Sequence, residues 1–183
     1  MYNPDKRTIA TERLILRPFQ LSDAQRVSEL CNNYNIYKST LALPYPYSIQ
    51  CALSWIETHE EYFENNISYD FAITNKDTKE LYGAIGLTNN LTHRNGEIGY
   101  WIGENYWGNG YATEATKAVL DFAFAEKNYH KVCARHFASN PGSGKVMQKS
   151  GMVQEGLLKQ HIYKENKFVD LVQYGVLNPL GAN

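Results

Sequence analysis

The stretch GEIGYWIGENYWGNGYATEATKAVL (residues 96–120) is the most informative part of the sequence, because it joins a strand, a glycine turn and a helix. GEIGYWIG is typical of a strand, and WGNGYA at 107–112 precedes a helix expected over 112–127. Glycine lets backbone approach a ligand closely, and free N–H groups at a helix start attract phosphate. No lysine or magnesium ligand is placed for hydrolysis. The turn therefore predicts a site that holds a pyrophosphate, with a tight connection as the plain alternative.

Further elements are expected on the N-terminal side of this stretch. YDFAIT (69–74) and LYGAIGL (81–87) resemble strands, and the turns NKDTKE and NNLTHRNG are typical of antiparallel neighbours. ERLILRP (12–18) alternates as a strand does. A helix over 22–33 is expected from a capping box of Ser22 and Gln25, and Ser48 caps a second helix over 48–64.

The C-terminal side adds a strand at 130–137, a short helix near 143–150, and strands near 157–164 and 168–177 joined by a turn at 165–167. This order predicts an α/β fold with a mixed, mostly antiparallel twisted sheet of about seven strands flanked by about four helices. One β-α-β crossover surrounds the 112–127 helix. A single domain is expected over residues 1–183.

Composition excludes several classes of protein. The formal net charge of −1 gives no bulk field for nucleic acid or a membrane surface, so neither partner is expected. The three cysteines are widely spaced and lack a metal-binding pattern, so no metal site is predicted. No apolar run approaches the roughly 20 residues of a membrane-spanning helix. We expect a cytoplasmic protein, monomeric or homodimeric.

The stretch PGSGK (141–145) resembles a nucleotide-hydrolysing loop but fails at fixed positions. That loop has the pattern G-x-x-x-x-G-K-[ST], in which the hydroxyl binds magnesium. With Gly144 and Lys145 as the G-K pair, the leading glycine is Ser139 and the hydroxyl position is Val146. We therefore exclude the hydrolysing loop.

The glycine turn resembles the [QR]-x-x-G-x-[GA] motif of the GNAT family of acetyl-CoA-dependent N-acetyltransferases. Trp107 to Ala112 matches it except at the first position. GYWIGENYWGNGYATEA and TERLILRPFQLSDA (11–24) resemble the branch that acetylates the N-termini of ribosomal proteins, the RimJ/RimL type. The resemblance covers Thr11 to Leu177 and implies the GNAT fold, with acetyl-CoA as co-substrate.

The resemblance also implies where the cofactor lies. Backbone groups of Tyr100, Trp101 and Ile102 would pair with the pantetheine arm, and Asn140 would contact the same arm. Lys145 would reach a CoA phosphate, or is a solvated side chain. The amides of residues 108–113 would hold the pyrophosphate. The turn residues expected to bind the cofactor are Trp107, Gly108, Asn109, Gly110, Tyr111, Ala112 and Thr113.

One family feature is absent. Many relatives carry a tyrosine seven residues after the asparagine, as the acid that protonates the leaving thiolate; this chain has Met147 there. Ser143 is the substitute candidate for the acid or for a hydrogen-bond donor to the thiolate. A serine that caps the helix is the structural alternative.

Acetyl transfer by direct attack needs a base and no enzyme nucleophile. Glu97 is the candidate base, acting through a water, with a solvated glutamate as the alternative; His93 is expected to be solvated. The resemblance implies a primary-amine acceptor in a ternary complex, such as the N-terminal α-amine of a ribosomal protein. A small amine remains open, and so does an acyl-CoA-binding module without turnover. Tyrosines 34, 37, 45 and 47 are expected in the acceptor groove.

Overall fold

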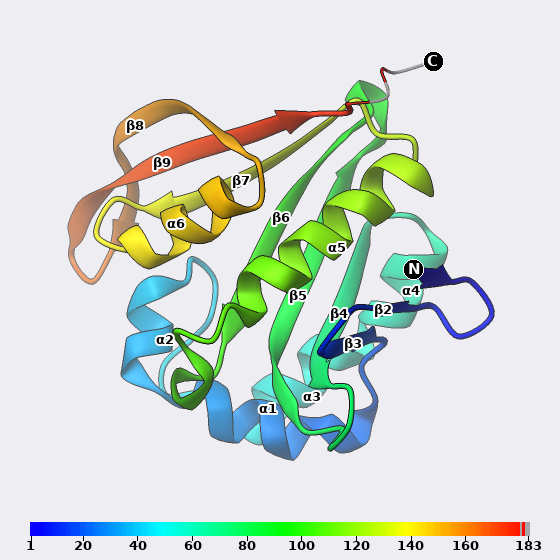
Figure 1. Ribbon diagram of the computed structural model, residues 1–183. Helices are drawn as coiled ribbons and strands as arrows, with labels where there is room; N and C mark the ends of the chain where they lie inside the picture. Colours follow the sequence, from blue (N-terminus) through cyan, green and yellow to red (C-terminus); the bar gives the residue numbers. More distant parts are fainter. Residues whose placement is uncertain (180, 182–183) are drawn as a thin grey trace.

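The computed structural model describes residues 1–179 and 181, and its centre is a mixed sheet. The strands lie in the order β1-β2-β3-β4-β5-β6-β7-β9-β8 (Figure 1). They are β1 (Tyr2–Asn3), β2 (Thr8–Ala10), β3 (Leu14–Arg17), β4 (Ser68–Asn75), β5 (Leu81–Asn90), β6 (Asn95–Ile102), β7 (Lys131–Phe137), β8 (Val153–Lys164) and β9 (Lys167–Leu177).

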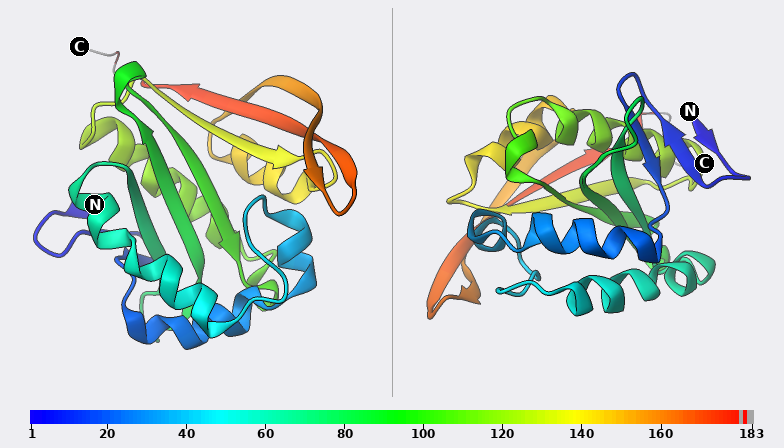
Figure 2. Two further views of the ribbon diagram at one scale, coloured as in Figure 1. Left: turned by 180° about the vertical axis from the view of Figure 1, so that it is seen from behind. Right: turned by 90° about the horizontal axis from the view of Figure 1, so that it is seen from below.

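Helices cover both faces of the sheet (Figure 2). One face carries α5 (Tyr111–Ala125) and α6 (Pro141–Lys149), and the other carries α1 (Ala24–Cys31), α2 (Tyr34–Ser39), α3 (Ile49–Glu57) and α4 (His59–Glu64). Side chains alternate along a strand. On β6, Ile98 and Ile102 therefore join the buried cluster under α5, whereas Trp101 joins the cluster under α1 and α3. The sheet thus has a core on each side.

The two strands around α5 separate before they end. β6 and β7 run parallel and pair only from Asn95–Lys131 to Ile98–Ala134, although β6 continues to Ile102 and β7 to Phe137. The ribbons of β6 and β7 diverge toward the ends of the two strands (Figure 1). β7 meanwhile pairs with β9 along its whole length. The separation leaves an opening in the sheet beside the second half of β6.

The predicted α/β fold and the crossover are confirmed. The described chain has nine strands rather than about seven, because the short β1 and β2 extend the sheet at its edge. It also has six α-helices rather than about four: α2 was not predicted, and the helix expected over 48–64 is interrupted at Thr58. The hydroxyl of Thr58 donates to the carbonyl of Trp55 at 2.8 Å there.

The capping box at Ser22 is wrong. A short 3₁₀ turn, Leu21–Asp23, precedes α1, and the backbone N–H of Gln20 donates to the Asp23 carboxylate at 2.8 Å. Asp23 also binds Arg17, so it holds the helix start against β3. The Ser48 cap is confirmed, because the Ser48 hydroxyl accepts from the Cys51 N–H at 3.3 Å. β8 begins at Val153 rather than near 157.

Candidate active site

A cavity of about 840 Å³ lies at the opening between β6 and β7. Residues on both sides of the sheet line it: the start of α5 and the length of α6 on one side, and α3 with the 39–44 loop on the other. Of the predicted catalytic and cofactor-binding residues, only Asn109 does not line it. The others are Glu97, Tyr100, Trp101, Ile102, Trp107, Gly108, Gly110, Tyr111, Ala112, Thr113, Asn140, Ser143 and Lys145. The structure therefore brings together residues from β6, the glycine turn and α6.

The glycine turn places free N–H groups at one end of the cavity. Gly108 and Gly110 have φ of +79° and +80°, a region that L-residues rarely adopt. Gly110 directly precedes α5, and the first intrahelical bond from this end is the Glu114 N–H to the Gly110 carbonyl at 3.0 Å. The N–H groups of Tyr111 to Thr113 thus lack helical acceptors. Together with the helix dipole they form a site suited to phosphate.

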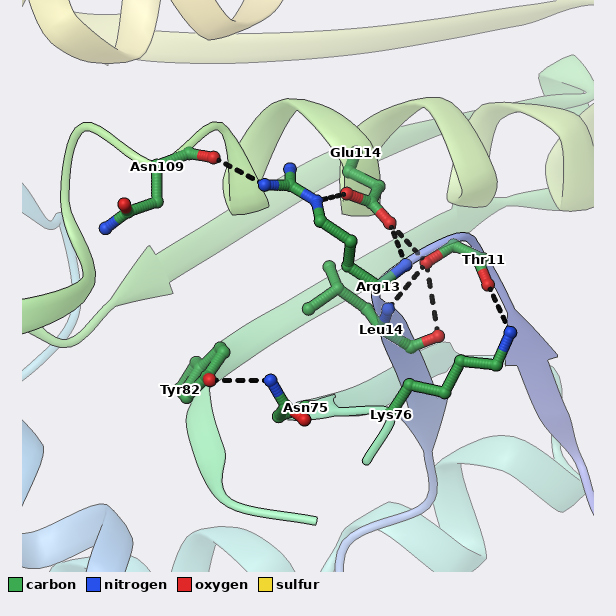
Figure 3. Close-up of polar contacts among 8 residues, drawn as sticks. All are labelled: Thr11, Arg13, Leu14, Asn75, Lys76, Tyr82, Asn109 and Glu114. Atoms are coloured by element: carbon green, nitrogen blue, oxygen red, sulfur yellow. Dashed lines mark hydrogen bonds and ion pairs between the residues drawn. The ribbon is translucent and has the colours of Figure 1, made fainter. Parts of the chain in front are cut away.

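An ion pair holds this turn against β3 (Figure 3). The Arg13 guanidinium donates to the Glu114 carboxylate at 2.7 Å and to the Asn109 carbonyl at 3.0 Å. The Thr11 hydroxyl and the Arg13 N–H donate to the same carboxylate at 2.6 and 2.8 Å. Burial raises the pKa of Glu114, but these hydrogen bonds outweigh burial and the net pKa is lowered. Glu114 is therefore an ionised anchor of the turn.

Asn109 and Trp107 bond within the turn. The Asn109 amide donates to the carbonyls of Tyr106 and Trp107, both at 3.1 Å. This explains why Asn109 does not line the cavity. The indole N–H of Trp107 donates to the Ile102 carbonyl at 2.6 Å, so one acceptor position on this part of β6 is already occupied.

Tyr100 on β6 meets Ser143 on α6 across the opening. The phenol lies 2.8 Å from the Ser143 hydroxyl and donates to the Ser143 carbonyl at 3.1 Å. Burial raises the pKa of Tyr100 to about 12, against a smaller lowering by the bond to Ser143, so the phenol is protonated at neutral pH. The side chain of Asn140, not Ser143, caps α6 by accepting from the Ser143 N–H at 3.3 Å. The capping alternative for Ser143 is therefore wrong.

Glu97 and Arg135 form a two-pronged ion pair on the opposite face of the sheet. The guanidinium donates to each carboxylate oxygen at 2.8 Å. The hydrogen bonds to Glu97 raise the pKa of Arg135 despite partial burial. Both side chains are partly exposed and line the cavity. This pairing, which was not predicted, depends on the parallel register of Glu97 with Cys133.

The sequence profile of an acetyltransferase (GNAT) domain matches residues 13–153. The chain belongs to the GNAT acetyltransferase family. It is 31% identical over 172 residues to the uncharacterized N-acetyltransferase YoaA of Bacillus subtilis, covering 93% of this chain and 97% of that protein. It is 24% identical over 185 residues to the ribosomal protein uS5-alanine N-acetyltransferase of Escherichia coli, covering 97% and 94%.

A solved structure is similar over the same length. The spermidine N-acetyltransferase of Vibrio cholerae, in complex with CoA and spermine, matches with a TM-score of 0.78 and 25% identity, covering 92% of this chain and 97% of that chain. The profile and the relatives make this chain an N-acetyltransferase. The predicted family and enzyme class are confirmed.

In this acetyltransferase Met147 lines the cavity one helical turn after Ser143 and is almost fully buried. Its thioether has no proton to donate. The nearby hydroxyl pair of Tyr100 and Ser143 is the chemistry that the sequence did not reveal. The alternation of β6 places Tyr100 on the same face as Ile98, toward α6. The alternation along β6 can be read from the sequence, but the position of Ser143 opposite Tyr100 cannot.

Three of the four tyrosines expected in the acceptor groove lie outside the cavity and form an aromatic cluster. Tyr34, Tyr37 and Tyr45 pack on one another with centroids 5.5 to 5.7 Å apart, and only Tyr47 of the four lines the cavity. Lys164 on the β8–β9 hairpin donates to the Tyr37 carbonyl at 2.7 Å. The cluster therefore ties α2 to this hairpin.

The remaining candidates lie at the surface. His93 is exposed in a 3₁₀ turn and does not line the cavity, as expected. Lys145 is exposed on α6 at the cavity edge. Within residues 1–179 and 181, no helix has the length and apolar character needed to cross a bilayer.

Proposed function

We propose that this acetyltransferase moves the acetyl group of acetyl-CoA to a primary amine by direct attack within a ternary complex. One observation carries the proposal: a single cavity joins the anion-binding turn before α5 to the opposite face of the sheet through the opening between β6 and β7. Acetyl-CoA would occupy the α5–α6 side, and the amine would enter from the α1–α3 side. The two substrates would then meet at the opening.

The residues around the opening suit the cofactor. The N–H groups of Tyr111 to Thr113 would bind the pyrophosphate. Beyond Ile98, β6 has no pairing with β7, so its free edge would pair with the pantetheine amides as a strand does. Because Trp107 already donates to the Ile102 carbonyl, the pairing would rest chiefly on Tyr100 and Trp101. At the start of α6, Asn140 would contact the pantetheine arm. Lys145 on α6 would contact a phosphate of CoA.

Ser143 and Tyr100 would serve the leaving group. When the amine attacks the thioester carbon, the carbon–sulfur bond breaks and the sulfur leaves as a thiolate. The Ser143 hydroxyl would donate to that sulfur, and the Tyr100 phenol would turn its one O–H from the Ser143 carbonyl to the Ser143 hydroxyl. Such paired donors stabilise developing negative charge in a site shielded from water. The proton that the thiolate gains would be restored to Ser143 from Tyr100 or solvent.

Glu97 would take the amine proton through a water. Arg135 occupies one position on each carboxylate oxygen, and each oxygen retains a second lone pair for a water. The two hydrogen bonds from the guanidinium fix the orientation of the carboxylate, which a base needs in order to reach its proton.

For the acceptor, we propose the N-terminal α-amine of a ribosomal protein, supported by the RimJ/RimL-like motifs and the Escherichia coli relative. A polyamine is the second candidate, supported by the Vibrio cholerae relative solved with spermine.

Thiol release followed with a disulfide indicator tests the proposal. We expect acetyl-CoA to raise the melting temperature and thiol to appear only with an amine. The amines are spermidine and a hexapeptide that begins with alanine. A melting shift without thiol release for any amine would support an acyl-CoA-binding module instead. Failure of acetyl-CoA to shift the melting temperature would remove the cofactor assignment.

A further inference from the structure

Three positions on neighbouring strands form one row across the sheet. Asp70 on β4 pairs with Gly86 on β5, and Gly86 pairs with Gly99 on β6. All three line the cavity. Strands lie about 4.8 Å apart, so the row extends from Asp70 to the edge of the opening in two steps.

The glycines leave a hollow in this row. A Cβ built on Gly99 would meet no atom within 4 Å, so the space above Gly99 is open. A Cβ built on Gly86 would lie 2.4 Å from Oδ1 of Asp70, so the carboxylate leans over Gly86 toward Gly99. The Ser68 hydroxyl donates to the other oxygen, Oδ2, at 2.5 Å, which holds the side chain in place. Oδ1 therefore faces the hollow.

Among the described residues, no cationic side chain forms an ion pair with the Asp70 carboxylate. Glu97 in the adjacent row, by contrast, is paired with Arg135. The nearby His59 does not neutralise Asp70, because burial lowers the pKa of the imidazole more than Asp70 raises it. The sheet side of the cavity thus carries one carboxylate in excess.

The opposite charge lies on the other side. The charged residues of α6 that line the cavity are Lys145 and Lys149. An anionic cofactor beside α6 and a cationic amine beside β4 would each meet complementary charge. Both acceptor candidates are primary ammonium ions at neutral pH, so the same carboxylate suits either.

We infer that Asp70 binds the ammonium group of the acceptor in the hollow above Gly99, at the edge of the opening and beside the carboxylate that covers Gly86. This inference rests on the proposed function for the position of the acetyl group. Asp70 is a specificity-determining residue that selects cationic amines, and Glu97 remains the proposed base. The ligand class is a primary aliphatic ammonium, supplied by a polyamine or by a peptide N-terminus.

Calorimetric titration tests the inference without turnover. Spermidine, the alanine hexapeptide and its N-acetylated form are titrated into protein saturated with CoA. Asp70→Asn keeps the side-chain shape, and Asp121→Asn, on the exposed face of α5 outside the cavity, is the matched control. We expect Asp70→Asn to lower the affinity for at least one cationic ligand by roughly tenfold or more, and the control variant to bind as the parent does. The acetylated peptide should bind equally weakly to every variant.

Gly99→Ala is a second variant, because the added methyl enters open space and leaves Asp70 in place. It should weaken the same ligand while the melting temperature stays near the parent value. Comparison of the affinities for spermidine and for the alanine hexapeptide then identifies which ammonium compound binds in the hollow. Unchanged affinity of both variants for both cations would overturn the inference.

Kinetics separate binding from base catalysis. Asp70→Asn should raise the KM of the amine and leave kcat and the pH profile near those of the parent. A loss in kcat with a changed pH profile and an unchanged KM would overturn the binding role. If the parent releases no thiol, the proposed function is wrong. The binding inference is still tested in that case, because the calorimetric result does not depend on turnover.

Discussion

The phenol of Tyr100 lies 2.8 Å from the hydroxyl of Ser143, and this contact joins β6 to α6 where β6 leaves β7. The two hydroxyls line the cavity together with Met147. The resemblance to the family implied a tyrosine on the helix, where this chain has Met147; here a phenol comes from the strand and contacts a serine of the helix. The proposed donor to the leaving sulfur is thus a pair of residues from two elements.

Loss of either hydroxyl should slow turnover. Ser143→Ala should lower kcat by about tenfold to a hundredfold, because the thiolate loses its donor. Tyr100→Phe should have a smaller effect, because Ser143 keeps its own proton. Steady-state kinetics measure kcat, and calorimetry measures the acetyl-CoA affinity, which should change little. Ser54→Ala, at an exposed site on α3, is the control. A parental kcat in Ser143→Ala would remove Ser143 from the chemistry.

Glu97→Gln should lower kcat/KM most at neutral pH. As pH rises the amine loses its proton without help, so the variant should recover toward the parent rate. Arg135→Gln breaks the same ion pair but keeps the carboxylate, so it separates the two roles. If both variants show the same loss at every pH, the ion pair is structural and Glu97 is not the base.

Gly110→Ala should impair acetyl-CoA binding. Its φ of +80° makes a side chain costly, by about 1–2 kcal/mol, and the strain would shift the N–H groups at the start of α5. Gly151→Ala is the matched control, because Gly151 has φ of +89° and does not line the cavity. Both variants should lower the melting temperature. Only Gly110→Ala should weaken the binding of acetyl-CoA, as measured by calorimetry. If the two variants bind acetyl-CoA with equal affinity, the anion site at this turn is contradicted.

Glu114→Gln should change how stability depends on pH. The pKa of Glu114 is lowered in the folded protein, so its contribution is present above the ordinary pKa and is lost as pH falls through the folded value. At neutral pH the variant should lose about 1–3 kcal/mol of unfolding free energy. The free energy of unfolding, measured with urea, should therefore fall less steeply from about pH 6 to pH 3 for the variant than for the parent. Glu57→Gln, at an exposed site on α3, should keep the parental slope.

The local patterns predicted much of this molecule. Residues 96–120 indicated the strand, the glycine turn and the start of α5, because each depends on residues that are adjacent in the chain. Asn140 and Ser143 were proposed from the resemblance to the family, and their roles stay predictions. β1, β2 and α2 were missed, since two to six residues give too little periodicity to recognise.

Contacts between distant segments could not be predicted. Glu97 and Arg135 are 38 positions apart and meet only because of the register between β6 and β7. Asp70 faces the hollow only because it aligns with Gly86 and Gly99. At Ser22 the local pattern was misleading, because Asp23 forms the ion pair with Arg17 that fixes the helix start.

Mass spectrometry of the product from isotopically labelled acetyl-CoA tests the proposed transfer most directly. With spermidine or the alanine hexapeptide as acceptor, the label should appear on a nitrogen of the amine, with one CoA thiol released for each labelled product. Ser143→Ala should form the same product more slowly. If acetyl-CoA binds and the label stays on CoA with every amine, the cavity is a binding site and the proposed transfer is wrong.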